Sequence, residues 1–205
     1  MTSIYLIRHG ETDWNALERC QGTLDIPLNA RGVGQAEALR HALRDVAFDA
    51  AYTSPLTRAR QTAACVLRDT GVRPVAVPEL HEMSYGTYQG LAPNDWRAGD
   101  AAQWELDPWS VTFPDGESLA DVHRRATPLL DRIVGAHRGE TVLISGHGHL
   151  NRVLMLHALA ERVDFWSIAQ PNGGGHVLRY SGVDSLNRPA ATPLIVDGTF
   201  TDIRP

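Results

Sequence analysis

Short apolar segments alternate along this chain with stretches whose apolar residues recur at helical spacing. Residues 4–7, 50–53 and 142–144 have the length and composition of buried strands. A region of helical periodicity follows each of them. Because this alternation is typical of α/β proteins, the sequence predicts that class.

Several helix signals refine this prediction. Asn29 can cap a helix over about 31–46, with Val33 on its buried face. Ser54 followed by a proline predicts the start of the next helix. Ser118 and Asp121 resemble a capping box, and Pro128 inside the helix that follows predicts a kink or a break. Further elements are predicted as a helix at about 149–160 and strands at 75–77, 177–180 and 194–196.

The 205 residues fit a single domain over 1–205. Residues 86–117 stand apart, because they have weak periodicity and place three tryptophans among Gly, Pro and Asp. We call them segment 86–117. The segment could roof a site, or it could be a surface loop with its own small aromatic cluster.

Charge and composition exclude several classes of protein. The chain has 19 Lys and Arg against 24 Asp and Glu, a formal net charge of −5, so nothing favours non-specific nucleic-acid binding. No apolar run approaches the ~18 residues of a membrane span, and the N-terminus lacks the pattern of a signal peptide. The two cysteines fit reduced thiols, so we expect a soluble cytoplasmic protein.

Polar clusters follow the three predicted strands. They contain Arg8 and His9, then Arg58, then His147. If the strands are parallel neighbours, all three clusters meet at one edge of the sheet, where α/β proteins bind ligands. Two arginines and two imidazoles repel one another unless an anion lies between them, and a dianionic phosphoryl group fits this requirement.

The two histidines suggest a reaction. A neutral imidazole can attack phosphorus if its other ring nitrogen donates to a fixed acceptor, and a protonated second imidazole would stabilise the developing charge. With nine histidines in the chain, a metal must also be considered, since His147 and His149 form a His-x-His pair. No further Asp or His follows them closely, so a catalytic metal is the less favoured alternative.

These segments together resemble the histidine phosphatase superfamily, the phosphoglycerate mutase-like proteins. The similarity rests on five motifs in the family's order, from residue 4 to about 152. They are Arg8-His9-Gly10-Glu11-Thr12-Asp13-Trp14-Asn15, Ser54-Pro55-Leu56-Thr57-Arg58-Ala59-Arg60-Gln61-Thr62-Ala63, Leu80-His81-Glu82 with Tyr85-Gly86 and Gly90, Phe113-Pro114-Asp115-Gly116-Glu117-Ser118, and Ser145-Gly146-His147-Gly148.

The resemblance implies a three-layer α/β/α fold with a mostly parallel sheet and a mechanism without metal or cofactor. His9 would be the nucleophile, and Glu82 would protonate the leaving oxygen and then assist water. We expect the carboxyl group of Glu82 to be kept protonated by the nearby anions. The phosphate pocket would contain Arg8, Arg58, His147, Asn15, Gln21 and Gly22. Gln89 departs from the family, where a glutamate is common, so the packing of its loop could differ.

Three functions remain at this stage. A phosphatase of a small phosphorylated metabolite, such as a sugar phosphate, is favoured, because mutases of the family resemble longer chains with a larger insertion and tail. A phosphoglycerate mutase-type transferase and a non-catalytic phosphate-binding adaptor are the alternatives. No nucleic-acid or membrane partner is expected, and a homodimer is left open.

The substrate side is less defined by the sequence. His149 is an additional imidazole, and relatives with a Gly-His-Gly-His run at this point are typically phosphatases of sugar phosphates or small metabolites. Tyr88, Trp96, Trp104 and Trp109 could line the pocket for the rest of the substrate, or they could pack within segment 86–117.

Overall fold

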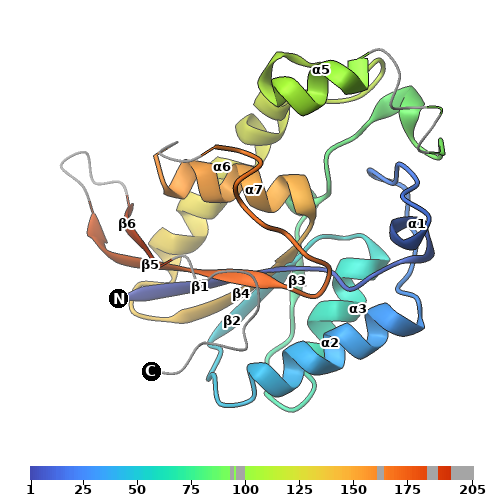
Figure 1. The fold of residues 1–205 in the computed structure, drawn as a ribbon. Helices are drawn as coiled ribbons and strands as arrows, with labels where there is room; N and C mark the ends of the chain where they lie inside the picture. The colour runs from blue at the N-terminus through green and yellow to red at the C-terminus, as the bar shows by residue number, and fades with distance from the viewer. Residues whose placement is uncertain (93–94, 96–99, 161–163, 184–188, 195–205) are drawn as a thin grey trace.

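The computed structural model describes residues 1–92, 95, 100–160, 164–183 and 189–194 (Figure 1). Its six strands form one sheet in the order β3-β2-β4-β1-β5-β6. Strands β1 to β4 pair with one another in parallel, whereas β5 is antiparallel to β1 and to β6. The strands are β1 (Thr2–Arg8), β2 (Ala50–Thr53), β3 (Val75–Ala76), β4 (Thr141–Gly146), β5 (Gly175–Val183) and β6 (Pro189–Leu194).

Helices cover both faces of the sheet (Figure 1). On one face, α2 (Ala30–Ala42) and α3 (Thr57–Val66) pack on Tyr5 and Ile7 of β1. On the other, α6 (Leu119–Ala136) and α7 (Gly148–Ala158) pack on Ile4 and Leu6. Alternate residues of a strand point to opposite faces, so β1 supplies both cores. The three-layer α/β/α prediction is confirmed.

The predicted helix starts are confirmed at two positions. The side chain of Asn29 accepts a hydrogen bond from the N–H of Gly32 at 2.8 Å, and Ser118 forms the capping box with Asp121. Of the kink or break predicted at Pro128, the break is wrong, since α6 continues through this residue.

The placement of Val33 on the buried face is also wrong, because its side chain is 49% exposed. Gly32 is the residue that approaches the rest of the chain. A Cβ atom added to it would lie 2.0 Å from the carbonyl oxygen of Glu11, so the helix contacts its neighbour through the glycine and turns Val33 outward.

The start predicted for α3 at Ser54 is wrong by two residues. The Ser54 N–H donates to the Ser145 carbonyl at 3.0 Å, which continues the pairing of β2 with β4. The helix therefore begins at Thr57, after Leu56. The side chain of Asp25 accepts the Thr57 N–H at 2.6 Å, so a distant loop supplies the cap.

Segment 86–117 folds beside α6 and α7 (Figure 1). Its elements are η2 (Gly86–Tyr88), α5 (Asp100–Leu106) and η3 (Pro108–Ser110). Its two ends are tied together, because the N–H of Thr87 donates to Pro114 at 3.0 Å and that of Glu117 donates to Ser84 at 2.8 Å. Trp96 lies outside the described residues, as do 195 and 196 of the last predicted strand.

Two short elements, α1 (Asp13–Ala16) and η1 (Pro78–Leu80), complete the fold. None of the helices in the described part of the chain combines the length and the apolar character that crossing a bilayer demands.

Candidate active site

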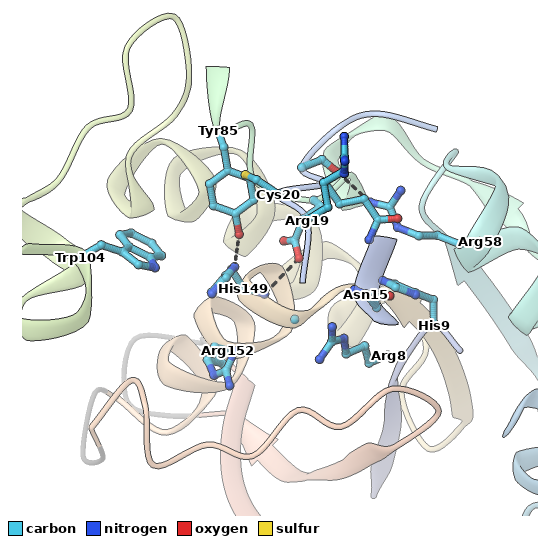
Figure 2. Close-up of a pocket in the computed structure, with 14 residues that line it drawn as sticks. Arg8, His9, Asn15, Arg19, Cys20, Arg58, Tyr85, Trp104, His149 and Arg152 are labelled. Carbon is cyan, nitrogen blue, oxygen red and sulfur yellow. Dashed lines mark hydrogen bonds between the residues drawn. The ribbon is translucent and has the colours of Figure 1, made fainter. Parts of the chain in front are cut away.

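The three polar clusters meet at the carboxyl ends of β1, β2 and β4, as the sequence predicted. Arg8 is the last residue of β1 and pairs in register with Gly146 of β4. His9 and His147 follow these strands, and their rings lie edge to face with centroids 5.1 Å apart. Arg58 stands in the first turn of α3. Arg8, His9 and Arg58 line a pocket whose side chains are shown in Figure 2, and His147 is not among the lining residues.

His9 is held in one tautomer. Its Nδ1 lies 2.6 Å from the carbonyl oxygen of Gly10. A carbonyl can only accept, so Nδ1 carries the proton and Nε2 keeps its lone pair. Burial, together with Arg58 and Arg8, lowers the pKa of His9 well below its ordinary value. The ring is therefore neutral at neutral pH, which is the form that a nucleophile requires.

Arg58 combines a fixed position with free donor capacity. It is 1% exposed, and its two terminal nitrogens donate to the carbonyls of Leu24 and Gly22, each at 2.7 Å. Its Nε and that of Arg8 are buried without a hydrogen-bond partner among the described residues. Burial lowers the pKa of Arg58 to about 10, so the group stays charged. An anion in the pocket would satisfy these donors.

His147 is completely buried at the residue that precedes α7. Neither of its ring nitrogens has a hydrogen-bond partner in the described part of the chain. Burial and then Arg58 lower the pKa of His147 well below its ordinary value. The structure thus favours a neutral ring with one N–H to donate, rather than the protonated group considered from the sequence.

Glu82 contacts the N-terminal turn of α7 from a separate loop. Its carboxylate accepts the backbone N–H groups of Met83 and Leu150 at 3.0 Å and that of His149 at 3.2 Å. Burial raises the pKa of Glu82, but His149 and these three amides outweigh it, and the net pKa is lowered. Without a bound anion the carboxyl group is therefore ionised, and its protonation near an anion stays a prediction.

Arg125 of α6 holds the loop that carries Glu82. It donates to the carbonyls of Glu79 at 2.7 Å and Glu82 at 3.3 Å, and it forms an ion pair with Glu117 at 2.7 Å. Glu117 in turn accepts the N–H of Ser84 at 2.8 Å. The loop that carries Glu82 is therefore held in place by a side chain of α6 rather than by the sheet.

Asn15 and Gln21 turn their amide oxygens toward other protein groups. Asn15 Oδ1 accepts from Thr12 and, at 3.2 Å, from Asn172, while Gln21 Oε1 accepts from the Thr12 hydroxyl at 3.0 Å. Both residues line the pocket. Their amide N–H groups are the ends left to donate to a ligand.

Gly22 lines the same pocket in a left-handed conformation, with φ +53°. Gln89 fixes this loop, because its side-chain oxygen accepts from the backbone and hydroxyl of Thr23 at 2.7 and 2.9 Å. A Cβ atom on Gly22 would lie 2.1 Å from that oxygen. Gln89, which replaces the glutamate common in the family, thus packs its side-chain amide against the loop that contains Gly22 and Thr23.

The other end of the pocket is lined by Tyr85, Trp104, His149 and Arg152 (Figure 2). The hydroxyl of Tyr85 is hydrogen-bonded to Nδ1 of His149, whose ring is stacked parallel to that of Phe165. Burial lowers the pKa of His149 to about 4. These groups form an aromatic wall with one cation.

Two substrate-side candidates do not line this pocket. Tyr88 packs on Phe113, with ring centroids 5.6 Å apart, and Trp109 is 40% exposed elsewhere on the surface. Of the two alternatives left open for these residues, lining the pocket is therefore wrong for Tyr88 and for Trp109. Trp104 alone of the described candidates from this segment reaches the pocket.

Arg19, Cys20 and Arg152 line the pocket and were missed as site residues. Arg152 had a usable signal, since it lies three residues after His149 in a predicted helix and therefore shares its face. Burial raises the pKa of Cys20 to about 12, which makes its thiol unreactive. No group of three or more metal-binding side chains is found within the described residues.

Comparison with known proteins identifies the family. A model described as the histidine phosphatase superfamily (branch 1) matches residues 4–185. The chain belongs to this superfamily. Three of the motifs that carry the resemblance supply the residues that meet at the sheet edge, which are Arg8, His9, Arg58 and His147.

Individual relatives carry different activities in their names. The chain is 35% identical to the uncharacterized phosphatase PhoE of Bacillus subtilis, over 72% of each chain. It is 34% identical to a 2,3-bisphosphoglycerate-dependent phosphoglycerate mutase of Azorhizobium caulinodans, over 75% of this chain and 79% of that one. The solved structure of YhfR from Bacillus stearothermophilus superposes with a TM-score of 0.86 at 30% identity, covering 98% and 99% of the two chains.

Proposed function

We propose that this protein is a phosphatase that hydrolyses a small phosphorylated metabolite through a phosphohistidine on His9, without a metal ion. The observation that carries the proposal is the fixed tautomer of His9. Its Nδ1 is committed to the Gly10 carbonyl, so the lone pair of Nε2 is available beside the buried Arg58 and the half-buried Arg8. That is the arrangement a nucleophilic imidazole needs in order to attack a phosphoryl group.

Arg8, Arg58 and His147 would bind the phosphoryl oxygens, with help from the amide groups of Asn15 and Gln21. The donors supporting this role are buried and unpaired among the described residues. They are already in position, so charge that spreads over the oxygens in the transition state meets fixed dipoles and cations. Two guanidinium groups supply the positive charge that a metal ion provides in other phosphatases.

In the first step, Nε2 of His9 would form a bond to phosphorus while the bond to the leaving oxygen breaks. That oxygen takes a proton from Glu82. A bound phosphate places negative charge near this carboxylate, which raises its pKa and lets it take up the required proton. In the second step, Glu82 accepts a proton from water, and the resulting hydroxide attacks the phosphohistidine. The products are inorganic phosphate and unmodified His9.

A mutase is the second candidate, and the 34% identity to a phosphoglycerate mutase favours considering it. The two functions differ only in what accepts the phosphoryl group, which is water in one and a bound hydroxyl in the other.

The test is a screen of phosphorylated metabolites with release of inorganic phosphate as the readout, together with an assay for interconversion of 3- and 2-phosphoglycerate. An alkaline quench and mass spectrometry of the peptide that contains His9 would detect the intermediate. Phosphate release with a phosphorylated His9 is expected. Turnover without any phosphoenzyme would refute the mechanism, and interconversion without phosphate release would identify a mutase.

A further inference from the structure

The loop of residues 170–174, which precedes β5, is hydrogen-bonded to the end of β1 that carries the proposed nucleophile. The N–H of Arg8 donates to the Gly174 carbonyl at 2.8 Å, and the N–H of Gly173 donates to the His9 carbonyl at 3.0 Å. None of the residues of this loop lines the pocket shown in Figure 2. The loop therefore supports the site from outside the pocket.

One side chain of this loop reaches a residue that does line the pocket. Nδ2 of Asn172, a half-buried residue, donates to Oδ1 of Asn15 at 3.2 Å and to the His9 carbonyl at 3.3 Å. Figure 2 shows Asn15 beside His9, as this shared donor requires. The His9 carbonyl already accepts the N–H of Gly173, so the bond to Asn15 is the more consequential of the two.

The direction of the Asn15 amide is set by its donors. The backbone N–H of Thr12 lies 3.2 Å from Oδ1 of Asn15, and an N–H group can only donate, so the atom that faces it is the oxygen. Asn172 presents its amide nitrogen to the same oxygen. A reversed Asn15 amide would place its own N–H groups against both donors. The arrangement shown therefore keeps Nδ2 of Asn15 for other partners.

The hydroxyl of Thr12 explains why a second donor is needed. It lies 3.1 Å from Oδ1 of Asn15 and 3.0 Å from Oε1 of Gln21, and both of these atoms are acceptors. A hydroxyl group has one proton, so it can orient only one of the two amides at a time. With Asn172 donating to Asn15, the Thr12 proton is available for Gln21. Without Asn172, the two amides compete for it.

We propose that Asn172 is a positioning residue, which directs the N–H groups of Asn15 and Gln21 toward the phosphoryl group. This inference rests on the proposed function, in which these two amides help to bind the phosphoryl oxygens. Asn172 acts through Asn15 and does not itself contact the ligand. Donors that are oriented beforehand lose less conformational entropy on binding and need no rearrangement during the reaction.

The experiment is a double-mutant cycle with inorganic phosphate as the ligand and calorimetric titration as the readout. Asn172→Ala should weaken phosphate binding by about threefold to tenfold, the usual net effect of one hydrogen bond. In an Asn15→Ala background the same substitution should leave the affinity almost unchanged, because the amide that it orients is absent. Contacts that act as a unit are not additive, and the cycle measures this coupling.

A second background guards against disturbance of the turn at Thr12. Asn15→Asp keeps an acceptor for the N–H of Thr12, but its two oxygens are equivalent, so its orientation no longer matters. Its added charge affects both sides of the comparison equally. Here too, Asn172→Ala should leave the affinity almost unchanged.

The matched control is Thr2→Val, at the opposite end of β1. The side chain of Thr2 donates to the His137 carbonyl at 3.0 Å and accepts the N–H of Gly139 at 3.1 Å. Its loss should lower the thermal transition and leave phosphate affinity unchanged. The inference would be overturned by an unchanged affinity in Asn172→Ala, by an equal loss in all backgrounds, or by an equal loss in Thr2→Val.

This test does not depend on turnover. A parent protein that binds phosphate but hydrolyses no ester would refute the proposed function, and the cycle would still measure the coupling between Asn172 and Asn15. A parent protein that binds no phosphate would overturn both proposals. In an active enzyme, the same coupling should appear in kcat/KM for 4-nitrophenyl phosphate.

Discussion

The carboxylate of Glu82 accepts the backbone N–H of Leu150 at 3.0 Å and so satisfies the first turn of α7. The proposed proton donor is therefore also the N-terminal cap of the helix that follows His147. Because the positive end of a helix favours the ionised form, this contact explains why Glu82 is a carboxylate in the structure. It also means that the residue serves stability and chemistry together.

Glu82→Gln should therefore affect poor leaving groups most. We expect kcat for an alkyl phosphate to fall by about 10²- to 10⁴-fold, the usual contribution of a general acid. The loss for 4-nitrophenyl phosphate should be smaller, because its leaving group needs little protonation. Steady-state kinetics with both substrates measure the difference. An equal loss for the two would argue against proton donation and for a purely structural role.

His9→Ala should abolish hydrolysis of an aryl phosphate, with a fall in kcat of about 10³-fold or more. Among the described residues the side chain makes one hydrogen bond, to its neighbour Gly10, so the fold should be preserved. Circular dichroism and the thermal transition check the fold beside the kinetics. Turnover equal to that of the parent protein would exclude His9 as the nucleophile.

Gly22→Ala should weaken both activity and stability. The residue has φ +53°, and a methyl group there would lie 2.1 Å from the side-chain oxygen of Gln89. We expect a destabilisation of about 1–2 kcal/mol from the left-handed backbone, and more from the collision. Urea denaturation measures it.

Gly34→Ala is the matched control, because Gly34 lies in α2 with no atom within 4 Å of the added carbon. It should stabilise the protein by about 0.5–1 kcal/mol. A stability loss of the same size in both variants would contradict the explanation given for Gly22.

The free energy of unfolding should fall on acidification. Burial lowers the pKa of His149 to about 4, whereas in the unfolded chain it returns to the ordinary value of about 6.5. Between these values the unfolded state binds the additional proton, so stability decreases as the pH falls from about 6.5 to about 4. The slope is about 1.4 kcal/mol per pH unit for each such histidine. Urea titrations of the parent and of His149→Gln should show a shallower slope in the variant, and identical slopes would contradict this assignment.

Removal of metal ions should leave hydrolysis unchanged. The proposed mechanism takes its positive charge from Arg8 and Arg58, so extended dialysis against a chelator has no target in it. Phosphate release before and after dialysis is the measurement. A loss of activity that added zinc restores would revive the alternative based on His147 and His149.

The sequence was most informative where function depends on strand ends. Arg8, His9, Arg58 and His147 could be placed together because each follows an apolar strand and parallel strands end at one edge. Local helix signals were less reliable. Ser54 was predicted to cap α3, but its backbone pairs with β4. Helical spacing failed for Val33 because Gly32, without a side chain, makes the closer contact. Both errors come from tertiary neighbours that local patterns do not include.

The end of the pocket away from His9 was harder to predict, because its residues come from distant parts of the sequence. Its wall combines Trp104 of α5 with Tyr85, His149 and Arg152, and only the last two are near in sequence. Tyr88 was an equally plausible candidate by composition, yet it packs on Phe113. The protonation of Glu82 also depends on three backbone amides, two of which belong to a helix more than sixty residues away in the chain.

The backbone hydrogen bonds that join the two ends of segment 86–117 have an evolutionary consequence. The backbone bonds from Thr87 to Pro114 and from Glu117 to Ser84 bring its two ends together, while the proposed phosphoryl machinery stands on the sheet and on α3 and α7. Insertions or exchanges between these bonds can therefore reshape the wall around Trp104 without moving His9 or Arg58. A lineage built on this chain could acquire new substrates by replacing one module, and directed evolution could begin at the same place.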